Sequence, residues 1–169
     1  TRSRKAWGEA QRMTAILVIV FLTGLNGFFA LSEIAVISCK PSRIQVLIDQ
    51  GERRARSVMG LMKEPEAFLS AIQVGITLIG VFSGAYGGLT FSLPVQHFLE
   101  SFAVLAPYAP QIAPVLVVGA ITYFTIVFGE LVPKAIALNN PEKIAILAAP
   151  MLVWFTRLTY PLVKILSLS

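Results

Sequence analysis

Residues 114–129 read PVLVVGAITYFTIVFG, an apolar run without a single charge, and the next five residues are Glu130-Leu131-Val132-Pro133-Lys134. A helix needs about 20 predominantly apolar residues to cross hydrocarbon, and residues 112–131 supply them. Glu130 then stands at or just inside the bilayer edge. A carboxylate there must be paired, hydrated through a cavity or bound to a cation. This stretch predicts a membrane helix and marks Glu130 as a candidate ion-handling residue.

The composition of the whole chain supports the membrane class. Of its 169 residues, 56% are hydrophobic and only 14% are charged, whereas a soluble domain carries roughly 25% charged residues. This length suits one compact domain with three or four spans and no sizeable aqueous domain. The lone Cys39 excludes an internal disulfide framework. The net charge of +5 suits a partner surface of anionic lipid. The basic residues flank the spans, which argues against a nucleic-acid partner.

We expect an all-α membrane protein with three transmembrane helices, at about residues 14–38, 67–91 and 112–131. Residues 1–13 form a polar N-terminal segment, and residues 14–169 form the transmembrane domain.

A fourth apolar stretch, residues 144–168, differs from the others. Arg157 and Lys164 interrupt it, as do Pro150 and Pro161. A charge at the bilayer centre costs at least about 2.5–3.5 kcal/mol. We therefore expect a bent, belt-like helix at the membrane interface, with a true fourth span as the alternative.

The loops predict the orientation of the chain. The loop at residues 39–66 is basic, whereas the loop at residues 87–111 has no lysine or arginine. By the positive-inside rule the first loop is cytoplasmic and the second external. With three spans, this places the N-terminus outside and the C-terminus in the cytoplasm, although four basic residues near the N-terminus argue the other way.

Within the first loop, residues 41–63 predict two short amphipathic helices broken near Gly51. A solvated connector with a basic face is the plainer interpretation of that loop, and a lipid or nucleotide site is the alternative.

Polar residues recur on one face of each predicted span. Asn26 and Glu33 are seven residues apart, and Tyr123 precedes Glu130 by seven, so each pair shares a helix face. The second span carries a stripe of small and polar residues: Ser70, Gln73, Thr77, Gly80 and Gly84. Facing inward, these residues predict an oxygen-rich cavity with two carboxylates. Such ligands suit a hard cation such as Mg²⁺ or Na⁺. His97 and Cys39 each stand alone, which argues against a zinc or copper site.

Each of these features also has a structural interpretation. Gly80-x-x-x-Gly84 and Gly84-x-x-x-Gly88 match a helix-dimerisation pattern, and Asn26 can serve as interhelical glue. Glu130 can pair with Lys134, four residues on. Pro133 is expected to break the local helix and free carbonyl groups, which favours ion coordination there.

Three segments carry a family resemblance: residues 25–38 (LNGFFALSEIAVIS), 70–80 (SAIQVGITLIG) and 128–137 (FGELVPKAIA). Together they resemble the transmembrane domain of the CNNM/CorC family of magnesium transporters, whose bacterial members are often labelled hemolysin-like. The similarity extends from about Ile16 to the C-terminus.

The resemblance implies a homodimer in the inner (plasma) membrane with three spans per subunit. It implies that Mg²⁺ binds in a cavity open to the cytoplasm and is exported, coupled to Na⁺ entry. Family members continue into a CBS-pair module that binds ATP and then into a small C-terminal domain. We therefore expect this chain to be the membrane part of a longer protein.

The resemblance also suggests site residues. Glu130 matches the acid of the family's Gly-Glu-hydrophobic-hydrophobic-Pro motif. Asn26 stands where many members have serine, and Glu33 stands where vertebrate-type members have asparagine. The chain departs from the family at three positions, because Ala30 replaces a frequent serine and Ile76 and Gly80 replace asparagines. The candidate metal ligands are Glu130, Asn26, Glu33, Thr77, Ser32 and Ser83.

Three functions compete at this point. Export of Mg²⁺ leads, and export of another cation, Co²⁺ or a polyamine, is the second. The third is a membrane anchor and dimerisation domain without transport. No convincing nucleophile–base pair occurs in the sequence, so we do not expect an enzyme.

Overall fold

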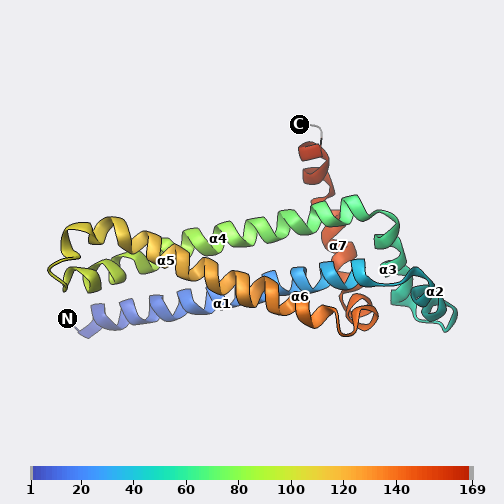
Figure 1. The fold of residues 1–169 in the computed structure, drawn as a ribbon, viewed down its shortest axis with the longest axis horizontal. Coiled ribbons are helices and arrows are strands. Elements are labelled where there is room, and N and C mark those ends of the chain that lie inside the picture. The colour runs from blue at the N-terminus through green and yellow to red at the C-terminus, as the bar shows by residue number, and fades with distance from the viewer. Residues whose placement is uncertain (1, 168–169) are drawn as a thin grey trace.

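The computed structural model describes the backbone of residues 2–167 and the side chains of residues 10–161. Within that part the chain is helical and contains no β-strand. Three long helices, α1 (Arg2–Ser38), α4 (Pro65–Glu100) and α5 (Ala109–Ile126), run alongside one another (Figure 1). The other elements are α2 (Pro41–Asp49), α3 (Arg53–Lys63), η1 (Ala106–Tyr108), η2 (Val127–Leu131), α6 (Val132–Ala137) and α7 (Pro141–Ser167).

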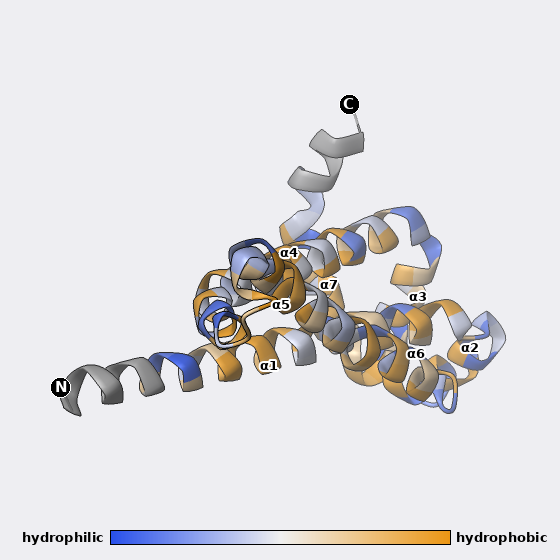
Figure 2. Cartoon of the chain, turned by 60° about the vertical axis from the view of Figure 1, so that its left-hand side comes forward, coloured by the Kyte–Doolittle hydropathy of each residue, from blue (hydrophilic) through white to orange (hydrophobic). Residues whose placement is uncertain are grey.

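The long helices are largely hydrophobic in sequence (Figure 2), and many of their large apolar side chains are exposed while others are buried. Leu17, Phe82 and Val115 are each more than 60% exposed in the isolated chain. Exposed apolar surface of this extent marks a membrane or protein contact. Four stretches are long and apolar enough to cross a membrane: Ala10–Ser38, Pro65–Glu100, Ala106–Ala137 and Pro141–Pro161. The chain is therefore a multi-pass membrane protein, as the composition predicts.

The two short helices predicted after the first span are present. Helices α2 and α3 are separated at Gly51, whose φ of +92° suits a residue without a side chain. Glu52 caps α3, because its carboxylate accepts a hydrogen bond from the Arg54 backbone N–H at 3.1 Å. Ile44 is fully buried against the bundle, whereas Val46 faces outward.

Helix α7 contacts α1, α3 and α4, and it crosses the long helices instead of running beside them (Figure 1). Its buried face is alanine-rich, with Ala145, Ala148, Ala149 and Leu152 inside. Pro150 and Pro161 lie within the helix, as expected for a bent element. The crossing direction suits a belt, and the length and hydropathy also suit a span. The three-span arrangement stays a prediction.

Two glycines of α4 bring neighbouring helices close. A Cβ atom at Gly75 would lie 2.9 Å from Phe155 Cζ of α7, and one at Gly87 would collide with Ile121 of α5. By contrast, Cβ atoms at Gly80 and Gly84 would meet nothing within 4 Å. The glycines that pack α4 against its neighbouring helices are thus not those of the predicted stripe, which leaves part of the stripe open.

Candidate functional site

The site begins with a local distortion of the third long helix. Helix α5 continues into η2, a π-helical turn, and then into α6, whose second residue is Pro133. Proline has no N–H and its ring crowds the carbonyl four residues earlier, here that of Gly129. We expected Pro133 to break the helix. The chain stays helical through Pro133, and the break is confined to the π-helical turn before it, where the helix widens by one residue.

The Gly129 carbonyl group, which Pro133 cannot bond because it has no N–H, forms a hydrogen bond with Asn26 instead. Asn26 Nδ2 donates a hydrogen bond to the Gly129 carbonyl oxygen at 2.9 Å, across from α1 to η2. The two backbones approach closely because both contact positions are glycine. A Cβ atom at Gly27 would lie 3.0 Å from Pro133 Cγ, and one at Gly129 would lie 3.1 Å from Asn26 Nδ2. Asn26 therefore fastens α1 to the π-helical turn.

This junction leaves an oxygen atom available. Asn26 is only 2% exposed, and its Oδ1 has no hydrogen-bond partner among the described residues. Such a buried acceptor costs about 1–3 kcal/mol when it stays unpaired. Asn26 lines a cavity of about 240 Å³ together with Glu130 and Thr125. The remaining walls include Thr122, Gly80, Gly84 and apolar side chains of α4 and α5.

The π-helical turn decides which hydroxyl groups line this cavity. In a regular helix, Tyr123 and Glu130 would share a face, as we predicted from their spacing. The extra residue rotates the preceding turn, so Thr125 lines the cavity, and Tyr123 is 66% exposed and absent from its walls. The buried Thr125 Oγ1, like Asn26 Oδ1, has no partner within the described part. The prediction for Tyr123 was wrong because periodicity assumes an undistorted helix.

Lys134 lies between the two carboxylates of the predicted site. Its Nζ is 2.7 Å from Glu130 Oε1 and 3.9 Å from Glu33 Oε2. The structural pairing of Glu130 with Lys134 is therefore present. The predicted single cavity with two carboxylates is not, because Glu33 and Glu130 line different cavities. All three side chains are partly covered, and together they carry one net negative charge when all are ionised.

Glu33 faces a different cavity from Asn26, although both lie on α1. It lines a hollow of about 670 Å³ with Ser70, Gln73 and Thr77 of α4. The predicted stripe is thus divided. The polar residues of the stripe line the cavity of Glu33, and its glycines line the cavity of Glu130.

The two predicted serine ligands lie outside both cavities' walls. Ser32 is fully buried, and its hydroxyl donates a hydrogen bond to the Phe28 carbonyl oxygen at 2.6 Å. Ser83 is 1% exposed and its Oγ has no partner among the residues that the structure describes. Neither serine lines the cavity of Glu130 or that of Glu33.

Comparison of the sequence with known proteins shows which family the chain belongs to. The model of the Cyclin M transmembrane N-terminal domain matches residues 17–169. The chain belongs to the CNNM family. UPF0053 protein sll0260 of Synechocystis is 46% identical over 154 residues, which cover 91% of this chain and 34% of that protein. UPF0053 protein YhdP of Bacillus subtilis is 31% identical over 91% of this chain and 35% of its own length. The Polyamine export protein of Escherichia coli is 30% identical over 85% of this chain and 34% of its own length.

This CNNM domain thus spans about a third of the length of the curated relatives that it matches. The matched segment includes every residue of both cavities. Sequence reasoning missed Thr122 and Thr125 in the cavity of Glu130. The proline three residues after Glu130 was the available signal for them, because a proline inside a helix is a common cause of such a distortion.

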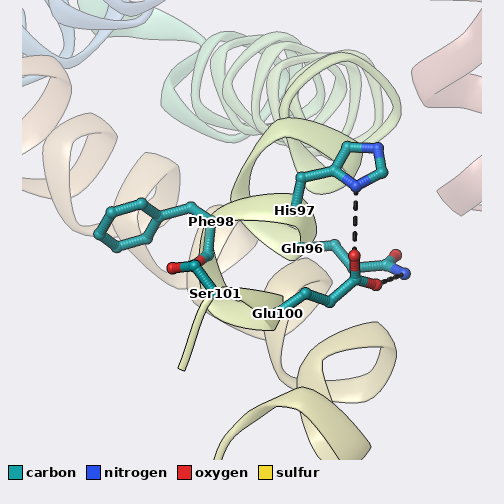
Figure 3. A network of polar contacts seen from close by, with 5 residues as sticks. All are labelled: Gln96, His97, Phe98, Glu100 and Ser101. Atoms are coloured by element: carbon teal, nitrogen blue, oxygen red, sulfur yellow. Dashed lines mark hydrogen bonds and ion pairs between the residues drawn. The ribbon is translucent and has the colours of Figure 1, made fainter. Parts of the chain in front are cut away.

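The lone histidine of the CNNM domain lies far along α4 from these cavities. We expected His97 in an external loop, but it occupies the last turn of α4 (Figure 3). Its Nδ1 lies 3.2 Å from Glu100 Oε2, and Gln96 Nε2 donates to Glu100 Oε1 at 2.8 Å (Figure 3). The histidine side chain is 74% exposed, as a surface residue should be. Within the described residues, no three His, Cys, Asp or Glu side chains gather as a metal cluster.

Proposed function

We propose that this CNNM domain exports a cation, Mg²⁺ first among the candidates, through the cavity between α1, α4, α5 and η2. The observation that carries the proposal is the set of oxygen atoms there. One carboxylate, Glu130, shares the cavity with Asn26 and Thr125, each of which has a buried oxygen without a hydrogen-bond partner in the described chain.

The donor set suits a hard cation. Mg²⁺ prefers oxygen ligands, keeps several waters and needs only one or two protein carboxylates. A water occupies about 30 Å³ in the liquid, so a cavity of about 240 Å³ has room for a partly hydrated ion. Glu130 supplies the charge, Asn26 Oδ1 and Thr125 Oγ1 supply neutral ligands, and the open backbone at Gly80 and Gly84 leaves space.

Lys134 acts as the resident counter-ion in this mechanism. A cation that approaches Glu130 must displace the ammonium group from its 2.7 Å contact. Glu33 lies within 3.9 Å of the same ammonium group and can retain it. Exchange between the two carboxylates keeps each of them compensated while the cation enters and leaves, which lowers the cost of an unpaired charge in the membrane.

The assembly around the site belongs to the same proposal. It comprises a homodimer in the inner (plasma) membrane, with an outside N-terminus and a cytoplasmic C-terminus. Na⁺ entry drives export, and a cytoplasmic CBS-pair module follows in the full-length protein. The basic segment at residues 40–63 supports the orientation, since the other long connection has no lysine or arginine.

Equilibrium Mg²⁺ binding to the purified chain, followed by flux from liposomes, tests the proposal. The informative variants are Asn26→Ala and Glu130→Gln, and Glu100→Gln at the far end of α4 is the matched control. We expect saturable binding in the parent and the control. We expect Glu130→Gln to lose it and Asn26→Ala to weaken it. Unchanged binding and flux in Glu130→Gln would remove the carboxylate from the site. The complete absence of cation flux in the parent would favour an anchor domain.

Export of an organic amine is the second candidate. An ammonium group already lies between Glu33 and Glu130, because Lys134 places one there. One relative is named Polyamine export protein. Competition of putrescine and of Co²⁺ with Mg²⁺, measured on the same parent protein, separates the candidates. Half displacement of Mg²⁺ by putrescine at a concentration below that of Mg²⁺ would make an amine the preferred ligand of the site.

A further inference from the structure

We propose that a second, separate cavity, between α3, the start of α4 and α7, binds the phosphate group of an anionic phospholipid. This cavity has a volume of about 400 Å³. Two arginines line it, Arg56 from α3 and Arg157 from α7. These helices are far apart in sequence but in contact in the fold. The proposal does not depend on which cation the domain exports.

The net positive charge of the cavity lining favours an anionic ligand. Neither Arg56 nor Arg157 lies within 4.0 Å of a carboxylate in the described chain, where the ion pairs involve other residues. Glu64 also lines the cavity, so the lining carries one net positive charge. Two like charges on one cavity repel each other, and a phosphate that both contact removes that repulsion. Guanidinium groups bind phosphate through two parallel hydrogen bonds, which favours arginine for this task.

The other walls suit the rest of a lipid headgroup. Ser57 contributes a half-buried hydroxyl group, and Thr156 contributes one whose hydrogen is already donated to the Leu152 carbonyl at 2.9 Å. Leu61, Phe68 and Val153 provide apolar surface beside these polar groups. A cavity with cationic and apolar walls side by side matches the boundary between a phosphate and its glycerol backbone.

The position of Arg157 supports a lipid as the source of the phosphate. It interrupts an apolar helix that is long enough to reach into a membrane. A charged group in such a helix is tolerated when it reaches the headgroup layer or a partner charge. Helix α3 adds Arg53 and Arg54 near Arg56, which raises the local concentration of anionic lipid. The sequence left open a lipid or nucleotide site in this basic segment, and the cavity favours the lipid.

Native mass spectrometry of the full chain, extracted from membranes that contain phosphatidylglycerol and phosphatidylcholine, tests the proposal. We expect the parent to retain phosphatidylglycerol selectively. The double variant Arg56→Gln/Arg157→Gln should retain it at least about tenfold less. The matched control is Lys63→Gln, an exposed basic residue of the same helix that does not line the cavity. Equal selective retention by the parent and the double variant would overturn the site.

Two further measurements test whether the lost binding is specific and whether the phosphate belongs to a lipid. Thermal unfolding in phosphatidylcholine alone should be the same for the parent and the double variant, and Arg157→Lys replaces Arg157→Gln if it is not. This lysine variant keeps the charge and loses the bidentate geometry, so it should retain less lipid than the parent. Thermal protection by phosphatidylglycerol, but not by glycerol 3-phosphate or inorganic phosphate, supports the lipid. Equal protection by the soluble phosphates would assign the cavity to a free phosphate and overturn the lipid source.

Discussion

Glu33 and Glu130 are two carboxylates on two membrane helices that share one lysine, yet they have different surroundings. Glu33 faces a wide hollow of about 670 Å³ whose polar partners, Ser70, Gln73 and Thr77, line its α4 wall. Glu130 faces a smaller cavity of about 240 Å³ with two unsatisfied oxygen atoms from its neighbours. Under the proposed function, charge alone therefore does not make a cation site. Unpaired oxygens held next to the charge distinguish Glu130.

The largest expected effect is on transport when each carboxylate is neutralised in turn. Glu130→Gln removes the one charged side chain among the residues that line the smaller cavity, and we expect Mg²⁺ flux from liposomes to fall about 100-fold or more, equivalent to about 3 kcal/mol. Glu33→Gln leaves that ligand set intact and should lower flux by less than about tenfold. A larger loss in Glu33→Gln than in Glu130→Gln would reverse the assignment of the two cavities.

The shared lysine gives the next effect, with the opposite sign. Lys134→Met removes the ammonium group that competes with a bound cation at 2.7 Å from Glu130. We expect Mg²⁺ affinity, measured by calorimetry, to rise by about tenfold, or about 1.4 kcal/mol. The thermal unfolding temperature without Mg²⁺ should fall, because both carboxylates lose their partner. Lys134→Arg is the control that keeps the charge. A weaker affinity in Lys134→Met would show that the lysine holds Glu130 in its binding position and does not compete.

Much of the fold followed from the sequence, whereas the site followed only in part. The apolar runs predicted the long helices, and Gly51 predicted the break between α2 and α3. Glu130 and Asn26, both nominated from the sequence, line one cavity. Helix geometry accounts for this success, because spacing rules hold wherever the backbone is regular.

The remaining sequence predictions were wrong where a backbone distortion or a neighbouring helix determined which residues face the cavity or the helix contacts. The π-helical turn at residues 127–131 moved Tyr123 away and brought in Thr125, and no spacing rule includes an inserted residue. The face of α4 that packs within the subunit was set by Gly75 and Gly87. Their role depends on Phe155 and Ile121, which are distant in sequence.

The two cavities can be separated by one conservative substitution in each. Thr125→Val removes a buried hydroxyl group without a partner from the cavity of Glu130, and Thr77→Val removes an exposed one from that of Glu33. A ligand of this kind contributes about 1 kcal/mol. We expect Mg²⁺ affinity to fall about fivefold in Thr125→Val and to stay unchanged in Thr77→Val. Equal changes in both variants would mean that the ion is shared between the cavities.

The smallest expected effect is on the reactivity of a buried thiol. Its labelling rate checks that the two carboxylate variants leave α1 in place. Cys39 follows α1, six residues after Glu33, and is buried. Burial and, to a smaller degree, the charge of Glu142 raise the pKa of its thiol to about 11. At pH 8 about one thiol in a thousand is then ionised, so maleimide labelling should be very slow and should accelerate with pH up to about 11. We expect the same slow labelling in Glu33→Gln and Glu130→Gln. Fast labelling in Glu33→Gln alone would attribute its transport defect to a displaced α1, and the comparison of the two carboxylates would then require a milder variant at that position.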